Sequence, residues 1–306
     1  MLGIDNKMQC LKCLKEIESS TTEHYGLHPE CFQEWFNVAE TEKFTGLQRR
    51  HSSSLENPNS HSKQNNSFFH GKFKKYSASL AGNSYILKMR QDDAPELPEV
   101  EYLCNQIGKE LSIPVAEFYY IDFYGDKTFV TKNFIKQDSP IDLQHIYHFR
   151  PDEDHSCEGL INAISKETGR PFDTRIFINT LLFDSLIGNH DRHGRNLAFI
   201  VTSSSTKLSP IYDNVSYLSL ETGPMLQADF NPTGRINTKD TFEPSMLDYV
   251  REFKRLGYQA EIDSFYKRLS ISRINQLIND SFCSDLMKQA IKRLIDKRFE
   301  ELENAR

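Results

Sequence analysis

Residues 189–196 of this chain read NHDRHGRN, and residues 211–213 read IYD. Asn196 follows Asp191 by five residues, and Asp213 comes after a short apolar run. Phosphoryl transfer from ATP needs one carboxylate to orient the attacking hydroxyl, and an amide and a second carboxylate to hold magnesium on the phosphates. We therefore predict a phosphotransferase site in which Asp191 is the base and Asn196 and Asp213 bind Mg²⁺.

Composition limits the class of protein. The 306 residues, 38% of them hydrophobic, suffice for a globular body with two lobes. A net charge of −6 argues against direct nucleic-acid binding through a general basic surface. The sequence has no apolar run long enough to span a bilayer and no apolar secretory signal at its N-terminus, so we expect a soluble, cytoplasmic protein. The six cysteines are too sparse for a disulfide scaffold and indicate a reducing compartment.

The chain divides into four parts by composition and pattern. Residues 1–40 carry a Cys/His cluster, and residues 41–67 are polar and Ser/Asn-rich, which is typical of a flexible linker. Residues 68–140 predict a small lobe of strands and one helix, and residues 141–306 predict a mostly helical lobe. The expected fold class is therefore α+β, with two lobes.

The small lobe is predicted from alternation and turn residues. Residues 76–80 and 84–88 read as two strands joined by a short turn, and Pro98 opens a helix with one apolar face. Residues 118–124 and 128–134 are aromatic and β-branched, which predicts a hairpin. The order is thus two strands, one helix and two further strands.

The first helix predicted in the larger lobe runs from Asp173 to Gly188, directly before the Asp/Asn stretch. Residues 196–202 and 207–212 are short strand-like runs. Pro244 opens another helix, and the last thirty residues give at least one more.

Lys88 and Glu101 are the ATP-contacting candidates of the small lobe. Lys88 ends a strand and suits the α- and β-phosphates, and Glu101 on the following helix suits an ion pair that fixes this lysine. Any one of these residues alone is more often a cap, a turn former or a solvated charge. The complete set in the order Lys, Glu, Asp-x4-Asn and Asp arises by chance far less often than any one of these residues alone.

Four segments carry a resemblance to a known family. They are YILK at 85–88, EVEYLCNQIGKELSIPV at 99–115, LIGNHDRHGRN at 186–196 and SPIYDN at 209–214. Over roughly residues 68–300 the chain resembles the HipA-like serine/threonine kinases of bacterial toxin–antitoxin systems. The resemblance implies a bilobal, protein-kinase-like fold.

The resemblance also implies roles for single residues. It makes Asp191 the catalytic base, Asn196 and Asp213 the Mg²⁺ ligands, Lys88 an ATP contact and Glu101 the helix glutamate of the family.

The residues that meet the nucleotide in the family are only partly matched. Lys132, Asn133 and Phe134 align with the hinge whose backbone meets adenine. In the glycine-rich loop only Gly71 and Lys75 match, and the serines that the family autophosphorylates are missing from their usual places. This departure weakens the case for autophosphorylation more than the case for ATP binding.

His193 lies between the two presumed active residues. We favour a role in fixing the loop, and the alternative is that it orients Asp191 or contacts the phosphates.

The resemblance further implies a biological setting. It suggests a growth-inhibiting toxin that phosphorylates a host-cell protein, commonly an aminoacyl-tRNA synthetase. It also implies neutralisation by a partner, with a DNA-binding, HipB-like antitoxin in the complex. The short chain is similar to the HipT-type architecture, in which a separate small HipS-like protein supplies the missing N-terminal piece.

Two alternatives stay open. The loop is close to the Gly-Asp-Arg-His-x-x-Asn loop of phosphoinositide kinases, although no basic, amphipathic membrane surface is apparent. The poor glycine-rich loop also suits a degenerate kinase that acts only as a binding module in an antitoxin or repressor complex.

The N-terminal segment has the spacing of a zinc site, Cys10-x2-Cys13-x14-His28-x2-Cys31. Four nitrogen and sulfur ligands leave no position for water, so the predicted zinc is structural. The alternative is three buried or free thiols beside a surface histidine.

Overall fold

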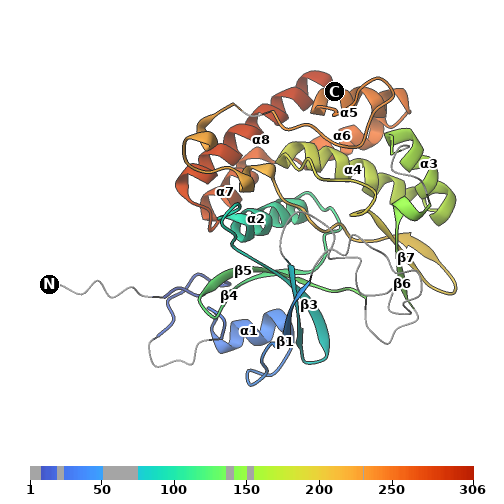
Figure 1. Cartoon of the computed structure of the whole chain (residues 1–306). Helices are drawn as coiled ribbons and strands as arrows, with labels where there is room; N and C mark the ends of the chain where they lie inside the picture. The colour runs from blue at the N-terminus through green and yellow to red at the C-terminus, as the bar shows by residue number, and fades with distance from the viewer. Residues whose placement is uncertain (1–7, 19–23, 51–74, 136–140, 150–154, 230) are drawn as a thin grey trace.

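The smaller lobe is built on a five-stranded antiparallel sheet of order β1-β2-β3-β5-β4 (Figure 1). Its strands are β1 (Thr45–Arg50), β2 (Lys75–Leu80), β3 (Asn83–Met89), β4 (Phe118–Phe123) and β5 (Asp126–Lys132). The structure is a computed structural model that describes residues 8–18, 24–50, 75–135, 141–149, 155–229 and 231–306. Gly82 and Gly125, at φ +76° and +95°, make the tight turns of the two hairpins.

The two faces of this sheet are covered by different helices. Successive side chains of a strand point to opposite faces, and β3 follows this rule. Tyr85 and Leu87 pack in a cluster with α1 (Pro29–Phe36), whereas Lys88 bonds to Glu101 on α2 (Leu97–Glu110). Figure 1 shows α1 and α2 on opposite sides of the sheet. The lysine is therefore directed to the side on which the larger lobe lies.

The larger lobe is mostly helical. Its α-helices are α3 (Cys157–Thr168), α4 (Pro171–Ile187), α5 (Met246–Arg255), α6 (Gln259–Arg268), α7 (Ile271–Asp280) and α8 (Asp285–Ala305). A three-stranded sheet of order β6-β7-β8 is formed by β6 (Asp142–His145), β7 (Ala198–Val201) and β8 (Thr206–Leu208). Single-turn 3-10 helices lie at η2 (Ile146–His148), η4 (Tyr217–Leu220) and η5 (Gly223–Gln227).

Helix α4 lies at the centre of this lobe. It is apolar on nearly all sides, as expected of a helix that is buried all round, and α3, α5, α6 and α8 pack against it. Gly188 ends it at φ +69°, and a Cβ there would lie 2.7 Å from Cδ2 of Leu294. Only glycine fits this close, left-handed turn, which begins the loop of residues 189–196.

The core joins α2 to the larger lobe. Val100, Leu103 and Ile107 of α2 belong to the same hydrophobic cluster as the buried residues of α4 and α8. A separate cluster lies between α1 and the sheet. Glu101 is thus carried by a helix that is anchored in the other lobe.

Most of the predicted elements are confirmed. They include the strand pair at 75–89, helix α2, the β4–β5 hairpin, helix α4, helix α5 and the C-terminal helix α8. The expectation of a linker from residue 41 is wrong for its first part, because residues 45–50 form β1 and bond to β2 through the backbone. Residues 51–67 lie outside the described residues. Helices α3, α6 and α7 and strand β6 were not predicted. Within the described ranges, no helix is long and apolar enough to cross a membrane.

Candidate active site

A lysine of the small lobe connects both lobes. The Lys88 Nζ donates to Glu101 Oε1 and Oε2 at 2.5 and 2.7 Å, and to Asp213 Oδ1 at 2.8 Å. Lys88 and Glu101 are only 3% and 1% exposed, respectively. The two carboxylates come from α2 and from the segment after β8, so this buried ion network forms only in the folded protein.

Lys75 joins the same network at the start of β2. Its Nζ donates to Asp213 Oδ2 at 2.8 Å, and its side chain is buried. Lys75 is one of the two residues that match the family's glycine-rich loop, and the structure places it beside the predicted metal ligand Asp213. Each oxygen of Asp213 therefore faces one ammonium group.

The charges fix the protonation states of these groups. Burial would raise the pKa of Asp213, but the ammonium groups of Lys75 and Lys88 outweigh it and hold this pKa below its ordinary value. Burial would lower the pKa of Lys88, but Asp213 and Glu101 outweigh it and raise this pKa. For Lys75 burial prevails, and its pKa is lowered. Asp213 is thus an ionised carboxylate at neutral pH.

The backbone around Asp213 is held against the end of α2. Ile211 donates its N–H to Pro114 O at 2.8 Å and accepts from Ala116 N at 2.9 Å. Asp213 itself is left-handed at φ +56°. Asp is one of the few residues that tolerate this conformation, which is often found at functional sites.

Arg192 ties the loop to the segment that carries Asp213. Its guanidinium is buried and donates to both oxygens of Asp184 at 2.7 and 3.0 Å. It also donates to Tyr212 O at 2.8 Å and to Asn214 Oδ1 at 2.6 Å. The carboxylates at 191 and 213 are therefore presented by two segments that share one buried arginine.

Asn196 organises the loop from within. Its Nδ2 donates to the backbone O of Asp191 at 2.8 Å, and its Oδ1 accepts from the backbone N of His193 at 2.8 Å. His193 Nδ1 accepts from the backbone N of Arg195 at 3.1 Å, which supports the predicted loop-fixing role of this histidine.

The Asp191 carboxylate is 42% exposed and faces a cationic cavity. The Nη1 of Arg235 donates to Asp191 Oδ1 at 2.9 Å, and Nε2 of His193 lies 3.8 Å from the same oxygen. Next to them is a cavity of about 380 Å³ lined by His155, His193, Arg195, Arg235 and Ile236.

The predicted hinge residues lie at the end of β5 and directly after it. Lys132 is paired in register with Tyr85, and Asn133 N donates to Ser84 O at 2.9 Å. Phe134 packs on a small apolar cluster that lies between the two sheets. Its members are Ile86, Ala116, Ile135, Leu143, Ala198, Ile200 and Tyr212. Residues 132–134 thus border the place where the sheets of the two lobes meet.

The structure brings together some of the predicted residues and leaves others apart. Lys75, Lys88, Glu101 and Asp213 form one network, whereas Asp191, His193 and Asn196 form one loop. Gly71 lies outside the described residues.

Sequence reasoning missed the contribution of Arg235 and the network of Arg192 and Asp184. The network of Arg192 and Asp184 could have been suspected from the sequence, because Asp184 is an acidic residue on a largely apolar, buried face of α4. No local pattern singles out Arg235.

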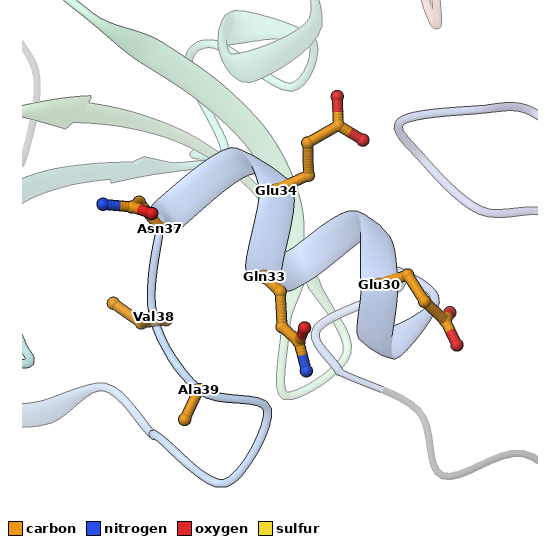
Figure 2. Close-up of a pocket in the computed structure, with 6 residues that line it drawn as sticks. All are labelled: Glu30, Gln33, Glu34, Asn37, Val38 and Ala39. Carbon is orange, nitrogen blue, oxygen red and sulfur yellow. The ribbon is translucent and has the colours of Figure 1, made fainter.

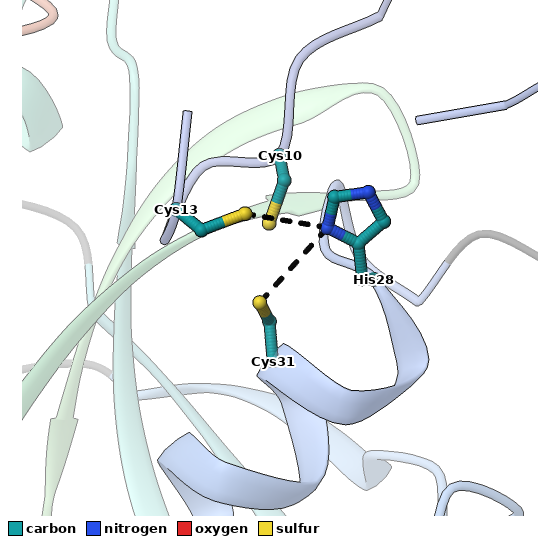
Figure 3. Close-up of side chains that lie close together, drawn as sticks. All are labelled: Cys10, Cys13, His28 and Cys31. Atoms are coloured by element: carbon teal, nitrogen blue, oxygen red, sulfur yellow. Dashed lines mark hydrogen bonds between the residues drawn. The ribbon is translucent and has the colours of Figure 1, made fainter. Parts of the chain in front are cut away.

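The Cys/His cluster forms as its spacing predicts. The ligand atoms of Cys10, Cys13, His28 and Cys31 all lie within 4.8 Å of one another (Figure 3). Nearby, a shallow hollow of about 470 Å³ lies beside α1 (Figure 2). It is lined by Glu30, Gln33, Glu34, Asn37, Val38 and Ala39, and no predicted site residue borders it.

Two curated proteins are similar in sequence to this chain. A putative kinase of Haemophilus influenzae is 30% identical over a match that covers 46% of this chain and 47% of that protein. The serine/threonine-protein kinase toxin HipA of Shewanella oneidensis is 23% identical, over 75% of this chain and 55% of that protein. The match thus spans about half the length of these relatives.

Two solved structures share the fold. The Helicobacter pylori proinflammatory kinase CtkA has a TM-score of 0.63 at 18% identity, covering 76% of this chain and 92% of that one. HipA of Shewanella oneidensis, solved with HipB and operator DNA, has a TM-score of 0.56 at 16% identity, covering 85% and 72%. The predicted bilobal, kinase-like fold is confirmed by these likenesses. The profile of the HipA-like C-terminal domain matches residues 55–295, most of the chain, and the chain therefore belongs to the HipA-like C-terminal domain family.

Proposed function

We propose that this chain is an ATP-dependent serine/threonine protein kinase. The observation that carries the proposal is the position of Lys88, which bonds at once to Glu101 of α2 and to Asp213 of the larger lobe. A lysine fixed by a helix glutamate and placed beside a metal-binding aspartate is the arrangement that protein kinases use for phosphoryl transfer. The kinase names of the relatives support the same reading.

The nucleotide is proposed to lie between the lobes. Lys88 contacts the α- and β-phosphates, and Glu101 holds its ammonium group in place. Lys75 is a second buried cation on the same side and suits a phosphate oxygen. The backbone of residues 132–134 meets adenine, whose ring lies against the apolar cluster around Ile86.

Asp213 and Asn196 are proposed to hold Mg²⁺, and their chemistry fits this ion. Magnesium prefers oxygen ligands, and the two residues offer a carboxylate and an amide oxygen. Each Asp213 oxygen accepts a single lysine hydrogen bond and keeps a further lone pair. When bound, Mg²⁺ neutralises the charge that develops on the transferred phosphoryl group.

Asp191 is proposed as the base that accepts the proton of the acceptor hydroxyl. Arg235 donates to Oδ1 of this carboxylate, which keeps further lone pairs for the incoming hydroxyl. The cavity beside Asp191 carries two arginines and two histidines. We propose that this cavity admits the acceptor and favours a protein segment with an acidic residue near its serine or threonine.

The relatives support a proposal about the biological setting. HipA of Shewanella oneidensis is described as a toxin, and its solved complex contains HipB and operator DNA. We propose that this chain is likewise a cytoplasmic toxin, neutralised by a small HipS-like protein and a DNA-binding HipB-like antitoxin. The proposed substrate is a host-cell protein such as an aminoacyl-tRNA synthetase. Self-phosphorylation is proposed only as a secondary activity, because the glycine-rich loop matches the family at few positions.

One experiment tests the function directly. Wild-type protein and Asp191→Asn are each incubated with ATP, Mg²⁺ and cell lysate, and new phosphosites are mapped by mass spectrometry. We expect serine or threonine sites that appear only with the wild type. A parallel reaction with phosphoinositide vesicles covers the lipid-kinase alternative, and label in lipid would overturn the proposal. Identical phosphosites for both proteins would instead favour a catalytically inactive binding module.

A further inference from the structure

We propose that Cys10, Cys13, His28 and Cys31 bind one structural Zn²⁺ that fastens the N-terminal segment to the outer face of the small-lobe sheet. The four side chains converge on one point, as Figure 3 shows. Their ligand atoms lie within 4.8 Å of one another, although Cys13 and His28 are fifteen residues apart. None of the three cysteines is in a disulfide.

The distances suit a tetrahedral zinc ion. The Nδ1 of His28 lies 3.4 Å from Cys13 Sγ and 4.0 Å from Cys31 Sγ. Zinc binds thiolate sulfur at about 2.3 Å and imidazole nitrogen at about 2.0 Å, so neighbouring ligand atoms of a tetrahedral site lie about 3.5–3.8 Å apart. None of the separations exceeds 4.8 Å, so an ion can be placed between the four atoms with shifts of at most about 1 Å. Four protein ligands close the site, which excludes a water-activating role.

The backbone presents the ligands in two pairs. Cys10 and Cys13 lie on a tight turn, in which Leu14 N donates to Cys10 O at 2.9 Å. His28 is the residue before α1, and Cys31 lies in the first turn of that helix, three residues later. Residues three apart share a face at the start of a helix, so His28 and Cys31 point their side chains to the same side.

The outer nitrogen of His28 is already engaged. Its Nε2 lies 3.0 Å from the backbone O of Glu16, so the ring donates its proton there. This leaves the lone pair of Nδ1 directed at the three sulfur atoms. Metal-binding histidines almost always donate their second ring nitrogen to a carbonyl or carboxylate, which fixes the tautomer and the ring orientation. This arrangement therefore favours a metal-binding histidine over the alternative of a surface histidine beside free thiols.

The segment held by the cluster covers the sheet. Phe36 of α1 packs on Tyr119 with a centroid distance of 4.3 Å, and Tyr25 stacks on Phe123 at 5.7 Å. The backbone N of Asp122 donates to Tyr25 O at 2.8 Å, next to the turn of β4 and β5. The covered face is the one opposite Lys88, so we expect loss of the metal to lower stability and to leave the phosphate-binding chemistry intact.

The metal content of the purified 306-residue chain tests the site. We expect about one zinc per chain by plasma mass spectrometry, because a closed four-ligand site holds a single ion. Cys13→Ser and Cys31→Ser should lower this to background. Cys283→Ser is the matched control, since Cys283 is a cysteine of the larger lobe outside the cluster, and it should retain the zinc.

A second set of measurements uses the wild type, so its outcome does not depend on whether the variants fold. Titration of wild-type thiols with an organomercurial should release the zinc stoichiometrically, and cobalt substitution should give the absorption of a tetrahedral thiolate site. The melting temperature should fall on chelation and recover with added zinc. The proposal would be overturned if the wild type were purified without zinc and its melting temperature did not change when zinc was added. Zinc retained in the Cys13→Ser/Cys31→Ser double variant would overturn it as well. Asp191→Asn should bind zinc normally, so this result is independent of kinase activity.

Discussion

The ammonium group of Lys88 lies 2.8 Å from Oδ1 of Asp213, and this contact joins two residues 125 positions apart in the chain. Lys88 belongs to the sheet of the small lobe, and Asp213 follows the small sheet of the larger lobe. The same lysine is held by Glu101, whose helix is packed into the core of the larger lobe. Glu101 and Asp213 are therefore both fixed relative to the larger lobe, and the small-lobe sheet contributes Lys88 and Lys75.

Replacing Lys88 by Met tests this contact. Because the carboxylate of Glu101 is 1% exposed, its loss of a partner should cost about 3–5 kcal/mol of stability. The free energy of unfolding, from urea titration, and nucleotide binding, from calorimetry, should both fall. Adding Glu101→Gln should recover part of the stability and none of the nucleotide binding. Failure of the double variant to recover stability would contradict a buried Lys88–Glu101 pair.

Asp191→Asn should separate chemistry from binding. Because the side chain is 42% exposed, we expect an unchanged melting temperature. Loss of a general base lowers the transfer rate by about 10²–10⁴-fold, while the dissociation constant for Mg·ATP should stay near that of the wild type. Initial rates of phosphate incorporation give the first quantity, and equilibrium dialysis gives the second. Full activity in this variant would exclude Asp191 as the base.

Asp213→Asn should impair the binding of Mg²⁺ and nucleotide rather than the proton transfer. An amide cannot match the charge of the carboxylate that faces Lys75 and Lys88, and it is a weaker magnesium ligand. We expect Mg²⁺-dependent nucleotide binding to be lost, with the Asp191→Asn variant as the control that retains it. Comparable Mg·ATP affinity in the two variants would argue against a metal-binding role for Asp213.

Arg192→Met should unfold the loop that carries Asp191. The buried carboxylate of Asp184 would lose two hydrogen bonds and its charge partner, at a cost of about 3–5 kcal/mol. Arg195→Ala is the matched control, because Arg195 is exposed on the same loop and should change the melting temperature little. Equal effects of the two substitutions on thermal unfolding would refute a special structural role for Arg192.

Arg235→Ala tests the acceptor side of the site. If the cationic cavity selects an acidic neighbour of the target hydroxyl, the KM for the protein substrate should rise about fivefold, which corresponds to roughly 1 kcal/mol for one partly exposed charge pair. The KM for ATP should not change, and Arg235→Lys should recover part of the effect. A lower KM for the protein substrate would show that Arg235 instead obstructs the acceptor.

The sequence by itself determined the locally encoded elements and the order of the chemical groups. Apolar periodicity predicted α2, α4 and the two hairpins, because each depends on residues within a few positions of one another. The spacing from Asp191 to Asn196 is local, and so the loop that joins them was readable. The four ligands of the proposed zinc site also meet as their spacing predicts.

Only the tertiary structure decided which charges face one another. Lys75 reaches Asp213 across 138 positions, and Arg235 reaches Asp191 across 44. Strand β1 is polar and forms only because β2 offers an unpaired edge, so composition alone suggested a linker. Such contacts depend on how the packed helices and sheets orient their surfaces, and no local pattern in the chain encodes that orientation.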